Sequence, residues 1–220
     1  MLLLKDNMDL MLQYNYLPQT LFYSMHSLDI STITKSYKNL IIDKMTLDHL
    51  DEDNIVLNKI YHMIITFLSL HYSNDLIGSL VQYKKYLNTR GLFLSIILGG
   101  NTLTELKKCF IEIDTKLYNK SFSRVIPMIK VDSMPSILKR ANYLTSIISV
   151  EKIKLHYDNL QELLYDVKNL GQTNFLLSKN NHYDCKSYFK QVESLYLQQF
   201  GVKNKVIATF EFIVVLSINN

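Results

Sequence analysis

The sequence predicts an α/β fold built on a largely parallel sheet, and three observations support this class. Residues 61–103 pass from an apolar run through a polar turn and an amphipathic segment to a glycine and a second apolar run. The runs at 63–70 and 92–98 have few polar interruptions, which is typical of parallel strands covered on both faces. The run at 206–218 is rich in β-branched and aromatic residues, which favour strands. Because no low-complexity linker interrupts the chain, we expect a single domain over residues 1–220.

Composition excludes several classes of protein. The 220 residues are 48% hydrophobic and 20% charged, which is ordinary for a globular domain. The net charge of +4 comes from scattered basic residues on predicted helices, so we expect no nucleic-acid binding. Every apolar run is shorter than the roughly 20 residues of a membrane span, and Lys5 and Asp6 interrupt the first run too early for a signal peptide. We therefore expect a cytoplasmic protein, in which Cys109 and Cys185 are free thiols.

The first third of the chain is predicted to alternate helices and strands, and two of the strands deliver a carboxylate to their ends. Helical periodicity predicts helices at residues 2–16 and from 32 to 37. Apolar runs predict strands at residues 21–30, 39–43 and 60–70. Asp29 lies near the end of the first of these strands and Asp43 at the end of the second. A polar loop is expected at residues 46–53.

Helix signals are clearer in the rest of the chain. Ser73 or Asn74 is expected to cap a helix at residues 75–87, and Thr102 with Glu105 resembles a capping box. Predicted helices follow at residues 103–117, 132–142, 160–170 and 183–200, with Pro135 in a first turn and Gly171 and Gly201 as stops. Gly91 is expected to turn the chain into a strand at 92–98, and further strands are predicted at 150–157 and 206–218. Residues 121–130 are predicted to form a loop or short strand.

Several short segments resemble the class I S-adenosylmethionine-dependent methyltransferases. The resemblance is to the branch shared by the malonyl-carrier-protein methyltransferase of biotin synthesis and the assembly-factor hydroxylase of respiratory complex I. The segments that carry it are LSLHYSNDL at 68–76, LNTRG at 87–91, GNTLTEL at 100–106, LGQTN at 170–174 together with Tyr157 and Asp166, and ATFE at 208–211. The resemblance runs from about residue 27 to 213, and the last two segments favour the hydroxylase side of the branch.

The resemblance implies a Rossmann-like class I methyltransferase sheet and S-adenosylmethionine as the ancestral cofactor. It assigns Asp29 to the ribose hydroxyls and Asp43 to the adenine, and it places His71 at the ligand end of the sheet. From the residues alone, Asp29 could equally cap a helix, Asp43 could be an ordinary loop residue and His71 a turn histidine. Tyr157 and Asn174 are the candidates for substrate contacts.

The sequence also departs from the family pattern. The family's Gly-x-Gly-x-Gly cofactor loop is expected just before the first helix, yet residues 1–13 contain no glycine. Tyr72 stands for the usual Trp, Thr89 for Pro and Asn101 for Asp. We therefore expect an N-terminally truncated domain that lacks the first strand and its loop. Since that strand is central in the family, its loss is expected to expose two apolar sheet edges. The helix at 2–16, or a complementing N-terminal fragment, could fill the gap.

Two function classes follow from these observations. The first is an S-adenosylmethionine-dependent methyltransferase-like protein, ancestrally for methyl transfer or complex I assembly-type hydroxylation, impaired by loss of the cofactor loop and acting on a protein substrate. The alternative is a non-catalytic assembly or binding module, or an inactive remnant. Methyl transfer depends mainly on positioning, so no catalytic residue is assigned. No metal site is expected, because His182 and Cys185 are too few ligands, and no Gly-x-Ser-x-Gly elbow indicates a hydrolase.

Overall fold

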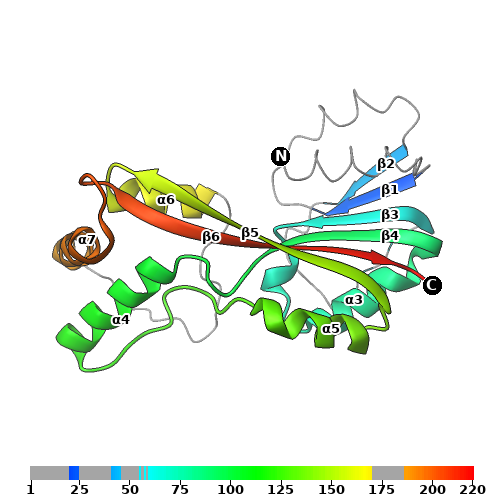
Figure 1. Ribbon diagram of the computed structural model, residues 1–220, viewed down its shortest axis with the longest axis horizontal. Coiled ribbons are helices and arrows are strands. Elements are labelled where there is room, and N and C mark those ends of the chain that lie inside the picture. The colour runs from blue at the N-terminus through cyan, green and yellow to red at the C-terminus, as the bar shows by residue number, and fades with distance from the viewer. Residues whose placement is uncertain (1–19, 25–40, 46–54, 56, 58, 170–185) are drawn as a thin grey trace. The chain divides into compact units, whose positions relative to one another are not determined.

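The computed structural model describes residues 20–24, 41–45, 55, 57, 59–169 and 186–220 (Figure 1). The strands are β1 (Thr20–Ser24), β2 (Ile41–Met45), β3 (Tyr61–Phe67), β4 (Leu87–Leu98), β5 (Thr145–Tyr157) and β6 (Val206–Ile218). The helices are α3 (Leu76–Lys85), α4 (Thr104–Tyr118), α5 (Met134–Arg140), α6 (Leu160–Asn169) and α7 (Lys186–Phe200), with 3-10 turns η2 (Leu70–Tyr72) and η3 (Val131–Ser133). The predicted α/β class is confirmed, and the predicted helices at 2–16 and 32–37 lie outside the described residues. No helix in these ranges is long and apolar enough to cross a lipid bilayer.

The six strands form one sheet in the order β2-β1-β3-β4-β6-β5. Strands β1, β2, β3 and β4 are parallel wherever they pair with one another. Strand β1 pairs directly with β3, in a register that runs from Leu21↔Met63 to Ser24↔Thr66. The expectation of two open edges on either side of a gap is therefore wrong, because the two strands that would flank the gap satisfy each other's backbone groups.

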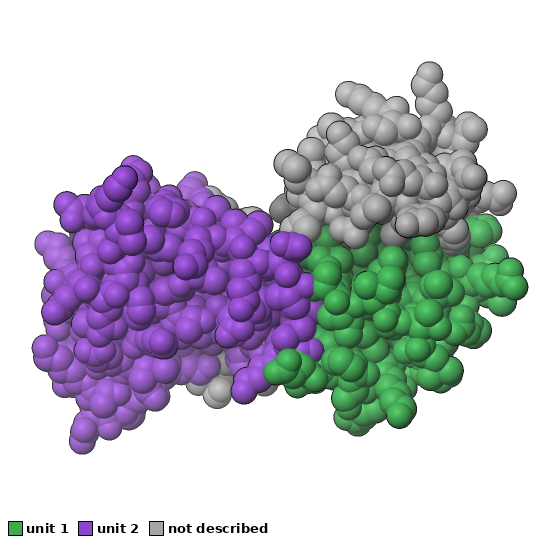
Figure 2. All heavy atoms as spheres, viewed as in Figure 1, with its two compact units in different colours: residues 1–97, 132–149, 214–220 green, residues 98–131, 150–213 purple. Residues whose placement is uncertain are grey.

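The chain forms two compact units (Figure 2). Unit 1 consists of residues 1–97, 132–149 and 214–220, and unit 2 of residues 98–131 and 150–213. Strands β5 and β6 each contribute residues to both units.

The core of unit 1 is formed by β3 and β4. All residues of β3 are buried except His62, which is half-buried, and the second half of β4 is buried throughout. This burial explains the continuous apolar runs that predicted both strands. The two polar side chains within these runs bond each other, since the Thr66 hydroxyl donates to Ser95 Oγ at 2.8 Å. On α3, Leu80 and Tyr83 are buried, and the ring of Tyr143 lies 5.3 Å from that of Phe93.

Strand β4 begins at Leu87, five residues earlier than predicted, so the predicted turn at Gly91 is wrong. The register against β3 shifts between Tyr61↔Leu87 and Met63↔Leu92, as at a bulge, and Arg90 takes a left-handed φ of 62°. Asn219 stabilises the bulge, because its carbonyl accepts from Arg90 N at 2.7 Å and its N–H donates to the Gly91 carbonyl at 2.9 Å. The bonding partner lies more than 100 residues away, so local turn signals did not reveal it.

Helix α3 is capped by Asp75, and the prediction of Ser73 or Asn74 is wrong. The Asp75 carboxylate accepts from Gly78 N at 2.9 Å. The hydroxyl of Ser73 instead bonds the hydroxyl of Ser79 at 2.9 Å. Ser73, Asn74 and Asp75 are all of types that cap helices well, and Asp75 is the cap because it lies next to the first helical residue.

In unit 2, a buried ion pair joins α4, the following loop and α7. Asp114 on α4 is fully buried, and Arg124 Nη2 lies 2.7 Å from its Oδ1. The Tyr188 hydroxyl of α7 donates to the same oxygen at 2.8 Å, and Phe122 N donates to Oδ2 at 3.2 Å. The guanidinium also lies over the Tyr188 ring, 4.4 Å from its centroid. These contacts hold Phe122 and Arg124 within residues 121–130, for which a loop or short strand was predicted and which form a loop.

Candidate functional site

The five residues predicted for cofactor and substrate contacts do not form one described site. Asp29 and Asn174 lie outside the described residues. Asp43 lies within β2, opposite Phe22 of β1, rather than at the end of the strand. His71 lies in η2 of unit 1, and Tyr157 is the last residue of β5 in unit 2.

His71 follows the carboxyl end of β3, which is the end where open α/β sheets bind ligands. Leu68 reverses the chain with a φ of 50°, and its N–H donates to the Ile96 carbonyl of β4 at 2.8 Å. The 3-10 turn closes with Ser73 N donating to the Leu70 carbonyl at 3.1 Å. His71 is 8% exposed, so this turn holds its imidazole inside unit 1.

The two segments GNTLTEL and ATFE, which the sequence linked to a family, lie side by side in unit 2. Glu211 on β6 is buried, and its carboxylate accepts from Asn101 Nδ2 at 2.7 Å and from Asn101 N at 3.2 Å. The Thr102 hydroxyl bonds the backbone of Glu211 twice, donating to its carbonyl and accepting from its N–H, both at 3.1 Å. Asn101 and Glu211 are 110 positions apart in the sequence.

A second set of bonds extends this contact to the start of α4. Leu103 N donates to the Thr209 carbonyl at 2.7 Å. Glu105 accepts from Thr209 N at 3.2 Å and also accepts from the Thr209 hydroxyl. The predicted capping box of Thr102 and Glu105 is therefore wrong, because both side chains bond β6. The residue before the helix is Leu103, whose backbone is left-handed, and no side chain caps the helix. We call residues 99–105 and 208–211 the motif junction.

The buried carboxylate of the motif junction belongs to Glu211. Burial raises the pKa of this carboxyl, but the hydrogen bonds from Asn101 and the ammonium of Lys152 outweigh burial and hold the pKa below its ordinary value. Lys152 Nζ lies 3.4 Å from Glu211 Oε2. Gly99 leaves room for the carboxylate, since a Cβ there would lie 2.5 Å from Glu211 Oε1. Glu211 is thus an ionised structural anchor rather than a proton donor at neutral pH.

The environment of Tyr157 keeps its phenol protonated. Burial and the nearby carboxylate of Asp166 raise the pKa of Tyr157 to about 12. Burial likewise raises the pKa of Tyr196, whose hydroxyl donates to the Ile207 carbonyl at 2.7 Å. A neutral phenol can donate a hydrogen bond to an acceptor group, but it cannot serve as a base at neutral pH.

The described glycines do not fit the cradle that S-adenosylmethionine needs. In that cradle a glycine leaves open the space that a Cβ would fill, so that the ligand approaches the backbone. Here the protein's own atoms lie within 3 Å of the added Cβ at four of these glycines, and at Gly100 the nearest atom is 3.4 Å away, which is an ordinary contact. The nearest atoms belong to Asp75 at Gly78, Asn88 at Gly91, Glu211 at Gly99, Lys130 at Gly100 and Leu197 at Gly201. Within the described ranges, no group of three His, Cys, Asp or Glu side chains could hold a metal ion.

Sequence reasoning identified the two segments of the motif junction but missed their contact. The sequence predicted Thr102 and Glu105 as a capping box and Glu211 as part of a closing strand, and it marked Asn101 only as a replacement for the family's aspartate. No spacing rule links residues 110 positions apart, so the pairing of Asn101 with Glu211 required the structure.

Known proteins similar to this chain point to one family. No protein-family model matches the chain. The mitochondrial arginine-hydroxylase NDUFAF5 of Dictyostelium discoideum is 33% identical over 153 residues, which are 69% of this chain and 35% of that protein. The Rickettsia prowazekii protein RP459, described as a methyltransferase, is 28% identical over 70% of each chain. The malonyl-[acyl-carrier protein] O-methyltransferase of Laribacter hongkongensis is 28% identical over 69% of this chain and 48% of that protein.

The chain thus spans only about a third of the Dictyostelium relative and about half of the Laribacter one. Among solved structures, the Bacillus halodurans protein BH2331, described as a methyltransferase, superimposes with a TM-score of 0.59. It is 9% identical and the match covers 96% of this chain and 97% of that one, so this likeness supports the fold alone.

Proposed function

We propose that this chain is a methyltransferase-like protein with impaired cofactor binding. The premise is that it belongs to the class I S-adenosylmethionine-dependent methyltransferases, in the branch of NDUFAF5 and malonyl-[acyl-carrier protein] O-methyltransferase. The fold and the relatives support the first half of this proposal. The second half rests on the glycines, because all the described ones face the protein's own atoms and no two glycines of the sequence have Gly-x-Gly spacing.

The proposal keeps three residues as cofactor contacts and two as acceptor contacts. Asp29, Asp43 and His71 are assigned to the cofactor, and Tyr157 and Asn174 to the acceptor. The buried position of His71 at the carboxyl end of β3 supports its assignment. The protonated phenol of Tyr157 supports a role in donating a hydrogen bond to the acceptor. The acceptor that we propose is a protein, because the names of the relatives specify an arginine or a carrier protein.

Calorimetric titration with S-adenosylmethionine tests this function. We expect no measurable heat, and no rise in the melting temperature, for a chain that unfolds cooperatively by circular dichroism. Binding at micromolar concentration would contradict the impairment and leave the family assignment in place. In that case His71→Ala should weaken the binding, while Lys190→Ala on the exposed surface of α7 should not.

A second candidate function is a non-catalytic binding module, and the motif junction favours it. Its hydrogen bonds give the segments GNTLTEL and ATFE a structural reason to occur together, so their presence does not require a cofactor. A module of this kind would bind its protein partner equally well with and without S-adenosylmethionine. Binding that requires the cofactor would exclude it.

A complementing N-terminal fragment remains a separate proposal. Such a fragment would carry a strand and the glycine loop, and it would have to separate β1 from β3, which pair directly. A synthetic strand-loop peptide with Gly-x-Gly-x-Gly should then restore cofactor binding to the chain. If the peptide does not restore it, no fragment of that type completes the site.

A further inference from the structure

Residues 150–156 of β5 form an exposed sheet edge in unit 2. Strand β5 is the last strand in the order, with β6 on one side and no described strand on the other. All seven of these residues are exposed. The segment contains no proline, and its lysines are edge residues of the kind that disfavours pairing with a like-charged strand. Its outward backbone groups are therefore available to another extended chain.

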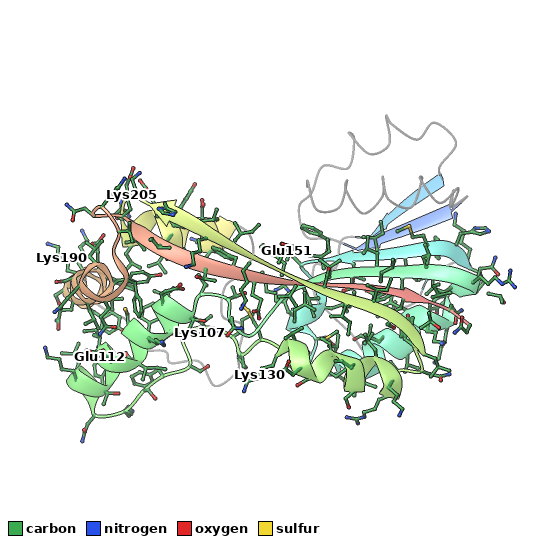
Figure 3. The ribbon with its side chains drawn as sticks, viewed as in Figure 1. Lys107, Glu112, Lys130, Glu151, Lys190 and Lys205 are labelled. Carbon is green, nitrogen blue, oxygen red and sulfur yellow. The ribbon has the colours of Figure 1, made fainter. Side chains whose placement is uncertain are left out.

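The side chains of this edge sort into two faces of different chemistry. Because successive residues of a strand point to opposite faces, Ile153 and Leu155 share one face with Glu151, which is labelled in Figure 3. Both apolar residues are 41% exposed. Lys152, Lys154 and His156 share the other face. The edge thus presents two lysines and a histidine on one face, and two apolar residues beside Glu151 on the other.

We propose that residues 150–156 bind an extended acidic segment of a partner protein by β-strand addition. Carboxylates at every second position of the added strand lie opposite Lys152, Lys154 and His156. The residues between them are apolar and cover Ile153 and Leu155. Lys152 remains accessible for this role, since its side chain is 57% exposed while its ammonium lies 3.4 Å from Glu211.

Charge complementarity favours this occupant over a second copy of the chain paired in the registers centred on residues 151 to 154. In an antiparallel pair, residues directly opposite each other share a face, and like charges in such positions are destabilising. Self-pairing centred on residue 151 places Glu151 opposite Glu151. Centring on residue 152 places Lys152 opposite Lys152, and centring on residue 154 places Lys154 opposite Lys154. Centring on residue 153 places Lys152 opposite Lys154. An acidic strand meets none of these repulsions.

The proposal does not depend on cofactor binding, and a peptide titration of the full chain tests it. The probe is a peptide of alternating glutamate and valine, with a scrambled peptide of the same composition and a lysine-for-glutamate peptide as controls. We expect saturable binding of the glutamate peptide alone, weakened by salt, with the amides of residues 150–156 protected from hydrogen exchange. Lys154→Glu should weaken binding about tenfold, because a cross-strand attraction becomes a repulsion.

Lys190→Glu on α7 is the matched control, since it makes the same charge change on an exposed helix outside this edge (Figure 3). It should leave binding unchanged. Absence of binding, equal weakening by both variants, or protection confined to other segments would overturn the proposal. So would a concentration-dependent dimer that protects the amides of residues 150–156 without peptide, because the occupant would then be a second copy.

Discussion

At Gly99, a residue that is distant in the sequence determines which residue type fits. The space that its side chain would need holds the Glu211 carboxylate, 2.5 Å from the position of an added Cβ. Gly100, the next residue, has its nearest atom at 3.4 Å, which is an ordinary contact. The two neighbouring glycines therefore make a matched pair for substitution.

Gly99→Ala should lower the free energy of unfolding by about 1–3 kcal/mol, as overpacking does in buried sites. Gly100→Ala should change it by much less. Urea unfolding followed by circular dichroism measures both values. Equal effects of the two substitutions would mean that the Glu211 carboxylate does not occupy the space at Gly99.

Asp114 carries the buried ion pair of unit 2. Asp114→Ala should cost about 3–5 kcal/mol of unfolding free energy, because it leaves the Arg124 guanidinium largely buried without this partner. The control is Asp158→Ala, which removes the exposed ion pair with Lys205 and should leave stability nearly unchanged. Urea unfolding compares the two variants, and a similar loss in both would argue against the buried pair.

At the scale of elements, strands and helices whose signals are local were predicted well. Strand β6 spans residues 206–218 as predicted, β3 differs from the predicted bounds only at its ends, and α7 ends at Phe200 as predicted. Residues 183–185 of that predicted helix lie outside the described residues. The errors at β4 and at the start of α4 occur where a residue bonds a distant one. Asn219 extends β4 through the bulge at Arg90, and β6 takes Thr102 and Glu105 away from the cap of α4. Elements can be predicted from periodicity, whereas these contacts cannot.

The cap of α3 provides a test at the same scale. Asp75→Ala should destabilise the protein by about 1 kcal/mol, because Gly78 N loses its acceptor. Hydrogen exchange of the α3 amides should accelerate accordingly. Asp75→Asn retains a good cap and serves as the control. If Asp75→Ala leaves exchange in α3 unchanged, another group caps the helix.

At the scale of the whole molecule, the fold class and the family followed from the sequence, but the sheet order did not. The direct pairing of β1 with β3 removes the open edges that a gap would have left. Of the five predicted site residues, Asp43, His71 and Tyr157 are described, and the structure assigns them to two separate units. A site that combines residues from segments far apart in the chain could be predicted only through resemblance.

The stability of the whole chain should depend on pH through Glu211. Its folded-state pKa is lowered, so its contribution is fully present above the unfolded-state pKa of about 4.3 and is lost as the pH falls through the lower folded-state value. Below about pH 4.3, the free energy of unfolding should therefore fall more steeply in the wild-type protein than in Glu211→Gln. Urea unfolding between pH 3 and 7 gives both profiles. Parallel profiles would show that the lowered pKa does not contribute to stability.

The amide at position 101 is matched to the carboxylate at position 211. Asn101 Nδ2 lies 2.7 Å from Glu211 Oε2, and Lys152 Nζ lies 3.4 Å from the same oxygen. An aspartate at position 101 would replace this donor with a second carboxylate, and the repulsion between the two groups would raise the pKa of both. A chain with Asn101→Asp would therefore rely on Lys152 alone to balance two acids.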